Sequence, residues 1–174
     1  MTRRKRITCS VGAVIALLLT GIVPNDVKLS HKGLALIGNA EQCRLTPYVC
    51  PAGHITNGIG NTHHVPNDVI PLAQVAQDWA RNIEAAQHCL EQALPNTRLT
   101  QGQYDAFTSF IFNTGCARFQ FNQDGSKTQI YQHITAGNYT AACHQLRRWV
   151  YGGGVKLKGL IIRRQKETAL CLSD

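Results

Sequence analysis

Acidic residues are scarce in this chain. Its 174 residues include 10 Asp and Glu against 18 Lys and Arg, which gives a formal net charge of +8. Glu41 is the only carboxylate between Val27 and Asn67, and no acid interrupts the seven cations between Arg147 and Lys166. A basic surface of this kind suits an anionic partner, which can be nucleic acid, an acidic lipid surface or peptidoglycan.

Other features that the sequence lacks exclude some of these partners. The chain has no internal repeat, no low-complexity segment and no nucleic-acid-binding motif, and aromatic residues are not interleaved through its basic stretch. We therefore expect no nucleic acid partner and favour peptidoglycan, although a solvated helix face has a similar composition. The length suits one domain with a sizeable core, and we expect a monomer without cofactor or metal.

The N-terminus looks like an export signal. Four cations at residues 3–6 precede an apolar run of 17 residues, 7–23. As a helix this run is about 26 Å long, slightly short of a hydrocarbon core of roughly 30 Å. No small-x-small cleavage site follows it directly, so we interpret residues 1–26 as a signal anchor and 27–174 as the catalytic domain. A conventional cleaved signal peptide is the alternative.

Seven cysteines are too many for an ordinary cytosolic enzyme, and export makes disulfides the expected state. Four of them lie in the C-terminal part and allow three pairings. We favour Cys89–Cys116 and Cys143–Cys171 as structural disulfides. The other three are Cys9, within the apolar run, Cys43 and Cys50.

Glu41 ends an apolar helical run and precedes a Gly-rich turn, where a catalytic acid is useful. Partial burial would raise its pKa and keep it protonated near neutrality. The alternative is an ordinary surface glutamate. Eight residues separate Glu41 from Cys50, and five more separate Cys50 from Thr56.

This spacing resembles the catalytic triplet of the phage-type lysozymes (glycoside hydrolase family 24), which is Glu, eight residues, Asp or Cys, five residues, Thr. The resemblance covers roughly residues 33–172. Its further motifs are Phe-Asn-Thr-Gly at 112–115, Leu-Arg-Arg-Trp-Val-Tyr-Gly-Gly at 146–153, Gly-Leu at 159–160 and Arg-Arg-Gln-Lys-Glu at 163–167.

The resemblance implies an endolysin that hydrolyses the β-1,4 bond between N-acetylmuramic acid and N-acetylglucosamine in peptidoglycan for host cell lysis. By analogy Glu41 is the general acid and Thr56 orients the attacking water. Cys50 stands where most family members have Asp, and it needs a lowered pKa to act as a base or to stabilise the transition state.

The anchor and Cys50 point to the signal-anchor-release (SAR) subclass of endolysins. We expect the protein to be tethered by residues 7–23 at the periplasmic face of the host inner membrane and freed into the periplasm on depolarisation. A Cys43–Cys50 disulfide would remove the catalytic thiol, and Cys9, once released, would exchange with Cys43 and free Cys50. The resemblance points the same way, because some such endolysins carry an anchor cysteine for this purpose.

The pattern predicts an α+β, lysozyme-like fold with a small β-hairpin lobe, a long connecting helix and a larger α-helical lobe, with a cleft between the lobes. Trp79 and Trp149 are expected in the core. Turn residues over 48–62 predict the hairpin, and apolar spacing predicts helices over 33–43, 72–94, 104–112, 127–135, 141–150 and 160–171.

Three alternatives remain. Cys43, Cys50 and His54 with His63 or His64 could bind zinc, although their spacing does not match the usual short knuckle. A cysteine endopeptidase of peptidoglycan would use Cys50 as nucleophile, but the chain has no identifiable Cys/His signature. A non-enzymatic membrane-active basic protein would not need Glu41. The histidines could also be polar contacts in the cleft, although exposed loop histidines are commoner.

Overall fold

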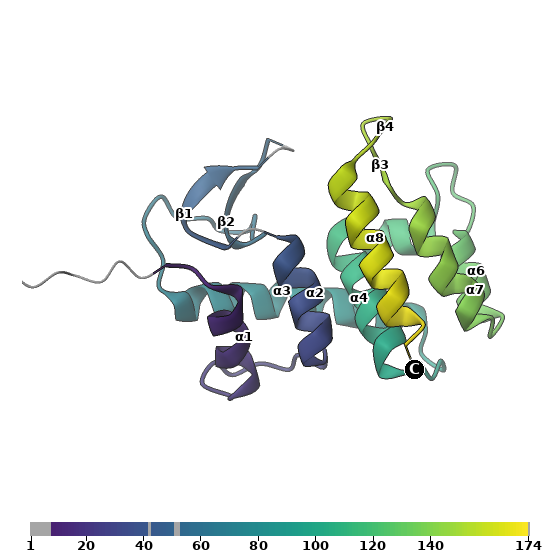
Figure 1. The fold of residues 1–174 in the computed structure, drawn as a ribbon, viewed down its shortest axis with the longest axis horizontal. Coiled ribbons are helices and arrows are strands. Elements are labelled where there is room, and N and C mark those ends of the chain that lie inside the picture. Colours follow the sequence, from purple (N-terminus) through teal and green to yellow (C-terminus); the bar gives the residue numbers. More distant parts are fainter. Residues whose placement is uncertain (1–7, 42, 51–52, 174) are drawn as a thin grey trace, which may run out of the picture. The chain divides into compact units, whose positions relative to one another are not determined.

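The computed structural model describes residues 8–41, 43–50 and 53–173. This part of the chain forms eight α-helices, one 3-10 helix and four short strands (Figure 1). It divides into two compact units: residues 1–26 with 41–82, and residues 27–40 with 83–174. The α+β, lysozyme-like class is confirmed, and the predicted cleft between the lobes stays a prediction.

A two-stranded antiparallel hairpin dominates the first unit. Strand β1 (Cys43–Val49) pairs with β2 (Ile55–Ile59), and Tyr48 lies directly opposite Thr56. The register shifts in the stretch before Tyr48, which contains Pro47. Proline has no backbone N–H to donate to a ladder, so it is tolerated where regular pairing is interrupted.

The apolar N-terminal run forms a shorter helix than expected. Helix α1 (Val11–Leu19) buries Val14, Ile15 and Leu18 within the first unit. Thr20 ends it, and the Thr20 hydroxyl donates to the carbonyl of Ala16, which competes with continued helix hydrogen bonding. In the described residues no helix has both the length and the apolar character needed to cross a membrane.

The longest helix, α3 (Leu72–Ala93), follows the predicted range closely. Val75 and Trp79 are fully buried on its apolar stripe, as expected from their spacing. Val75 packs on Gly58 of β2, where an added Cβ would come within 3.3 Å of the valine side chain. The boundary between the two units falls inside this helix, after Asn82.

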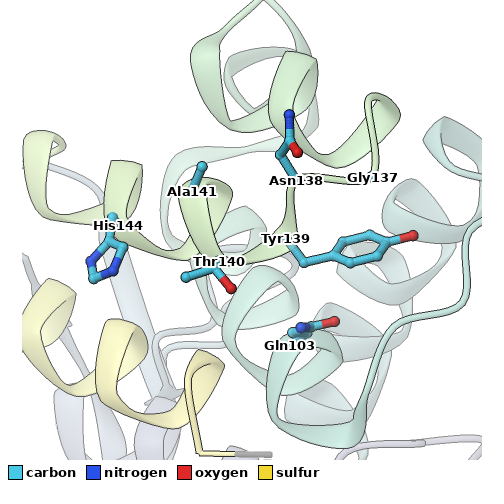
Figure 2. A pocket seen from close by; sticks show the side chains of 7 residues that line it. All are labelled: Gln103, Gly137, Asn138, Tyr139, Thr140, Ala141 and His144. Atoms are coloured by element: carbon cyan, nitrogen blue, oxygen red, sulfur yellow. The ribbon is translucent and has the colours of Figure 1, made fainter.

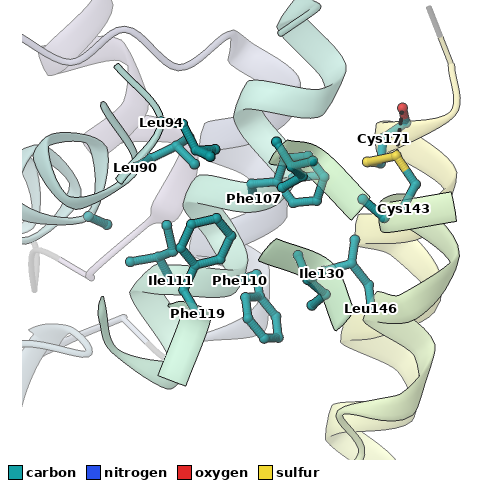
Figure 3. Close-up of a cluster of buried hydrophobic side chains, with 14 of the residues drawn as sticks. Leu90, Leu94, Phe107, Phe110, Ile111, Phe119, Ile130, Cys143, Leu146 and Cys171 are labelled. Carbon is teal, nitrogen blue, oxygen red and sulfur yellow. Dashed lines mark hydrogen bonds between the residues drawn. A yellow bond between two sulfur atoms is a disulfide. The ribbon is translucent and has the colours of Figure 1, made fainter. Parts of the chain in front are cut away.

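The second unit is almost entirely helical, and its core is a cluster of apolar side chains shared by several helices (Figure 3). Within it Phe110 meets the ring of Trp149 edge to face, with ring centroids 5.2 Å apart. Its elements are α2 (His31–Ala40), α4 (Gln101–Thr114), α5 (Cys116–Gln120), α6 (Gln129–Thr135), α7 (Tyr139–Gln145), the 3-10 helix η1 (Leu146–Arg148), β3 (Tyr151–Gly152), β4 (Val155–Lys156) and α8 (Lys158–Cys171).

Two disulfides connect elements of this second unit. They are Cys89–Cys116 and Cys143–Cys171, with Cα–Cα separations of 5.8 and 5.6 Å. These are the two pairs that the sequence analysis favoured. Each closes a loop of nearly thirty residues, and by loop-closure entropy such a crosslink stabilises the folded chain by about 3–4 kcal/mol.

A buried carboxylate fixes the start of α2, the helix that leads to Glu41. The Asp105 side chain is fully buried and accepts hydrogen bonds from the Ser30 backbone N–H (3.1 Å), the Ser30 hydroxyl and the Gln101 amide (2.8 Å). Ser30 in turn caps the helix, because its hydroxyl accepts from the N–H of Gly33. Asp105 therefore holds α2 against α4.

A second buried carboxylate joins α8 to α4. Glu167 is fully buried and pairs with both Arg163 and Arg164, and it also accepts from the Ser109 hydroxyl at 2.7 Å. Arg164 reaches Asn113 at the end of α4 as well. Two of the seven cations in the C-terminal basic stretch are thus internal, which corrects the expectation of one continuous basic face.

Two predicted helix ends were wrong, and one helix and one hairpin were missed. The helix predicted over 33–43 ends at Ala40, because Cys43 already pairs with Ile59 in the β1–β2 ladder. Helix α5 and the β3–β4 hairpin were not expected. The helix predicted over 141–150 ends at Gln145 and tightens into η1 before β3 begins.

The contact between Gly33 and Asp105 gives a stability prediction. An added Cβ at Gly33 would lie 2.6 Å from the Asp105 carboxyl carbon. We expect Gly33→Ala to lower the free energy of unfolding by about 1–3 kcal/mol, as overpacking usually does. Urea unfolding of the oxidised full chain measures it.

Gly159→Ala is the matched control, because nothing lies within 4 Å of an added Cβ at that helical position. This substitution should be neutral or stabilise the protein by up to about 1 kcal/mol. Equal midpoints for the two variants would contradict the proposed packing of α2 on α4.

Candidate active site

Glu41 lies directly after α2, at the bend that leads into β1, and is half-buried. Its carboxylate rests against Gly60, the residue after β2. An added Cβ at Gly60 would come within 3.3 Å of Glu41 Oε2, and Gly60 has a φ of +67°. Both the space and the backbone conformation therefore require glycine here.

Cys50 follows β1 at the tip of the hairpin, where a tight turn fixes its backbone. The Cys50 N–H donates to the carbonyl of His54 at 2.9 Å, and the N–H of Gly53 donates to the Cys50 carbonyl at 2.8 Å. All seven cysteines are described, and Cys50 alone among them is outside a disulfide. Its half-buried sulfur is therefore available as a thiol or thiolate.

Thr56 lies on β2 and is 2% exposed. Its hydroxyl donates to the carbonyl of His54 at 3.0 Å, the same carbonyl that accepts from the Cys50 N–H. With its proton committed in this way, the Thr56 oxygen has lone pairs left only to accept a hydrogen bond. Cys50 and Thr56 are thus connected through one carbonyl group.

Tyr48 was assigned no role from the sequence, but its pKa depends on both Glu41 and Cys50. Burial raises the pKa of the Tyr48 phenol, and the negative charges of Glu41 and Cys50 raise it further, whereas the Arg44 guanidinium lowers it. The guanidinium carbon of Arg44 lies 4.4 Å from the centroid of the Tyr48 ring. Both acidic groups thus act on one phenol, and Tyr48 lies opposite Thr56 in the ladder.

Cys43 forms a disulfide with Cys9, with a Cα–Cα separation of 5.3 Å. The bond connects the segment before α1 to the start of β1, within the first unit. The sequence analysis expected Cys43 to pair with Cys50 before exchange and with Cys9 after it. The structure has the second of these two pairings.

The alternative of a zinc site lacks one of its predicted ligands, because the Cys43 sulfur forms a disulfide with Cys9. His54, His63 and His64 are all exposed. Among the described residues no group of three or more His, Cys, Asp and Glu side chains is placed to hold a metal ion.

An open depression of about 590 Å³ lies in the second unit, around the start of α7 (Figure 2). It has no carboxylate or cysteine in its lining and contains none of the three residues of the predicted triplet. The residues that line it are Gln103, Gly137, Asn138, Tyr139, Thr140, Ala141 and His144.

Comparison with known proteins decides the family. The sequence profile described as phage lysozyme matches residues 38–167, which include the whole hairpin and its three predicted catalytic residues. The chain belongs to the phage lysozyme family. It is therefore a lysozyme, that is, a glycosidase, and the predicted enzyme class and endolysin function are confirmed.

The relatives of this lysozyme agree in length as well as in sequence. It is 39% identical to a SAR-endolysin of Escherichia phage P1 over 91% of this chain and 90% of the relative. It is 37% identical to a SAR-endolysin of Haemophilus phage HP1 over 97% of this chain and 96% of that protein. The predicted subclass is confirmed by these relatives.

Two crystal structures of the P1 phage endolysin Lyz, each 38% identical to this lysozyme, differ in how well they match it. The active form has a TM-score of 0.85 and covers 95% of this chain and 94% of its own. The secreted inactive form has a TM-score of 0.61 and covers 84% of this chain and 96% of its own. The fold of this lysozyme is thus more similar to that of the active form of Lyz than to that of the inactive form.

The packing of Glu41 on Gly60 gives a prediction about activity. Gly60→Ala pushes the Glu41 carboxylate away from the hairpin, and misplacing a catalytic group by about 1 Å is enough to lower kcat roughly 10- to 100-fold. Release of reducing ends from purified peptidoglycan measures the rate.

Gly125→Ala is the control, because Gly125 has a φ of +81° and nothing within 4 Å of an added Cβ. Both variants carry a similar backbone strain of about 1–2 kcal/mol, but only one touches Glu41. Equal rates for the two variants would show that the contact does not position the acid.

Proposed function

We propose that this lysozyme cleaves the β-1,4 bond between N-acetylmuramic acid and N-acetylglucosamine with Glu41 as its general acid, assisted by Cys50 and Thr56. The observation that carries this proposal is that all three residues lie on or against one hairpin. Glu41 packs on Gly60, directly after β2, whereas Thr56 lies in β2 and Cys50 follows β1. The charges of Glu41 and Cys50 both raise the pKa of Tyr48, which lies opposite Thr56 in the ladder.

Glu41 has the location that a general acid needs. It protonates the glycosidic oxygen as the bond to the sugar breaks, and its half-burial leaves part of the residue exposed to a substrate. Tyr48, with its raised pKa, stays a neutral phenol at neutral pH. It therefore adds no negative charge that would compete with the carboxylate for the positive charge of the transition state.

Cys50 and Thr56 act on the attacking water. As a thiolate, Cys50 takes a proton from that water or stabilises the positive charge that develops on the sugar. The Thr56 oxygen accepts a hydrogen bond from the same water, because its own proton is committed to the His54 carbonyl. Together the two groups fix both the direction and the protonation of the nucleophile.

The test of this chemistry is mass spectrometry of purified peptidoglycan digested by the oxidised enzyme in the Cys9–Cys43 form. We expect muropeptides with new reducing ends at muramic acid. Glu41→Gln should lower their rate of formation by about 10²- to 10⁴-fold, which is the usual contribution of a general acid.

Glu91→Gln is the matched control, since Glu91 is exposed and its carboxylate interacts at the surface with Lys28 and with the Tyr104 hydroxyl. It should leave the rate nearly unchanged. Peptide products, with Glu41→Gln fully active, would instead favour the cysteine endopeptidase. Lysis without any cleavage of peptidoglycan would favour the membrane-active alternative.

We further propose that residues 7–23 occupy two places in succession. Before lysis they tether the enzyme at the periplasmic face of the host inner membrane, where the four cations at residues 3–6 oppose release at roughly 2.3 kcal/mol per charge per 100 mV. After depolarisation the segment leaves the bilayer and folds as α1. The burial of Val14, Ile15 and Leu18 supports this, because it gives the apolar side chains a second dry environment.

Release and activation are coupled through one disulfide exchange. In the tethered form Cys43 is bonded to Cys50, and Cys9 in the bilayer cannot reach that bond. After release the Cys9 thiolate attacks the Cys43 sulfur, the Cys43–Cys50 bond breaks, and Cys50 leaves as a thiolate. The Cys9–Cys43 bond and the greater similarity to the active form of the P1 phage endolysin support this order of events.

Cell fractionation with thiol alkylation, before and after an uncoupler, tests both steps in cells that express the full chain. The wild type should move from the membrane to the periplasm while the alkylated cysteine changes from Cys9 to Cys50. Cys9→Ser should be released but stay inactive, with Cys50 protected from alkylation until a reductant is added.

The double variant Cys9→Ser/Cys43→Ser is the control, because it has no cysteine left to block Cys50, and it should be active without reductant. Undiminished lysis by the single Cys9→Ser variant would disprove the exchange. Retention of the wild type in the membrane fraction after depolarisation would disprove release.

A further inference from the structure

The β3–β4 hairpin is an exposed feature of the second unit. It follows η1 and precedes α8, at one end of that helix (Figure 1). Gly153 and Gly154, with φ of +57° and +81°, form its two-residue turn, a conformation that keeps short strands in register. The N–H of Leu157 donates to the carbonyl of Val150 at 2.9 Å and closes its base. The hairpin is therefore a defined structure and not a loose loop.

Four exposed cations lie in or next to this hairpin in the sequence, with no acidic residue among them. Arg147 and Arg148 precede it, Lys156 is in β4 and Lys158 begins α8, and all four are exposed. The sequence has no Asp or Glu between Asp124 and Glu167, and Glu167 is buried against two other arginines. No acidic side chain of this segment is therefore at the surface to offset the four charges.

The two faces of the hairpin differ. Tyr151 lies opposite Lys156 in the ladder, and Lys156 Nζ is 5.6 Å from the centroid of the Tyr151 ring. Tyr151 is 57% exposed. The other face carries Val155, which lies opposite Gly152, and Leu157, whose side chain covers Gly152. Aromatic and cationic groups thus share one face, and aliphatic groups share the other.

We propose that Tyr151 and its four neighbouring cations form a secondary binding surface for peptidoglycan, outside the catalytic residues. The inference rests on the proposed function, because it takes the substrate of that reaction as the ligand. The stem peptides of peptidoglycan carry free carboxylates that the cations attract, and the apolar face of a sugar ring packs on an exposed tyrosine. A lipid surface fits less well, because the aliphatic side chains lie on the opposite face from the Tyr151–Lys156 pair.

Cosedimentation with purified, insoluble peptidoglycan tests the surface. The full chain carries Glu41→Gln in every sample, so that binding is measured without turnover. Adding Lys156→Gln and Lys158→Gln should weaken binding about 3- to 10-fold at low salt, the range expected for two exposed charges. Tyr151→Ala should weaken it as well, and with less dependence on salt.

The matched control is Lys32→Gln with Lys166→Gln, two exposed lysines outside the hairpin. This pair removes the same charge and should change binding less than twofold. Peptidoglycan whose carboxylates have been amidated should bind the two lysine double variants equally, whereas Tyr151→Ala should still bind more weakly. Thermal unfolding of each variant checks that the fold is intact.

Equal losses for the control and hairpin pairs would overturn the inference, since only net charge would then matter. Unchanged binding by the hairpin variants would overturn it too. Loss of binding to phosphatidylglycerol vesicles but not to peptidoglycan would assign the surface to lipid instead. If the Glu41→Gln enzyme still cleaves, the proposed mechanism fails, whereas the binding comparison keeps its meaning.

Discussion

The bond between Cys9 and Cys43 is the constraint on which the active-site half of this lysozyme depends. It holds the segment that leads into α1 against the first residue of β1, two positions after Glu41. It also occupies the one sulfur that the proposed resting form uses to block Cys50. A closed loop of this length contributes about 4 kcal/mol through the entropy of the unfolded chain. The same bond therefore bears on stability, on the placement of α1 and on the state of the proposed catalytic thiol.

The second unit depends on buried carboxylates in a comparable way. Asp105 holds the start of α2, and Glu167 holds α8 to the end of α4. Each is fully buried and has several donors, which offset the loss of water around a charged group. Asp105 thus fixes the helix that ends directly before Glu41, although it lies 64 positions after the acid in the chain.

Long, strongly patterned features were predictable from the sequence. The stripe of α3, the cysteine pairs of the C-terminal part and the spacing of Glu41, Cys50 and Thr56 all depend on local periodicity or on a family pattern. Where α2 ends was not predictable, because a strand pairing with β2 decides it. The β3–β4 hairpin was missed because two-residue strands have too few positions to show alternation, although three consecutive glycines mark its turn. Charge alone also could not show that Arg163 and Arg164 are internal.

The chain has an odd number of cysteines, seven, and this number limits how they can pair. A fully oxidised chain with three internal disulfides must always retain one thiol, whatever its pairing. The protein therefore always has a thiol that can exchange with its own disulfides. Oxidation within a single molecule cannot remove this thiol. In this structure Cys50 is the cysteine outside the three disulfides. In the proposed exchange, the position of the one remaining thiol distinguishes the inactive from the active enzyme, and moving it requires neither a reductant nor a protease from the host.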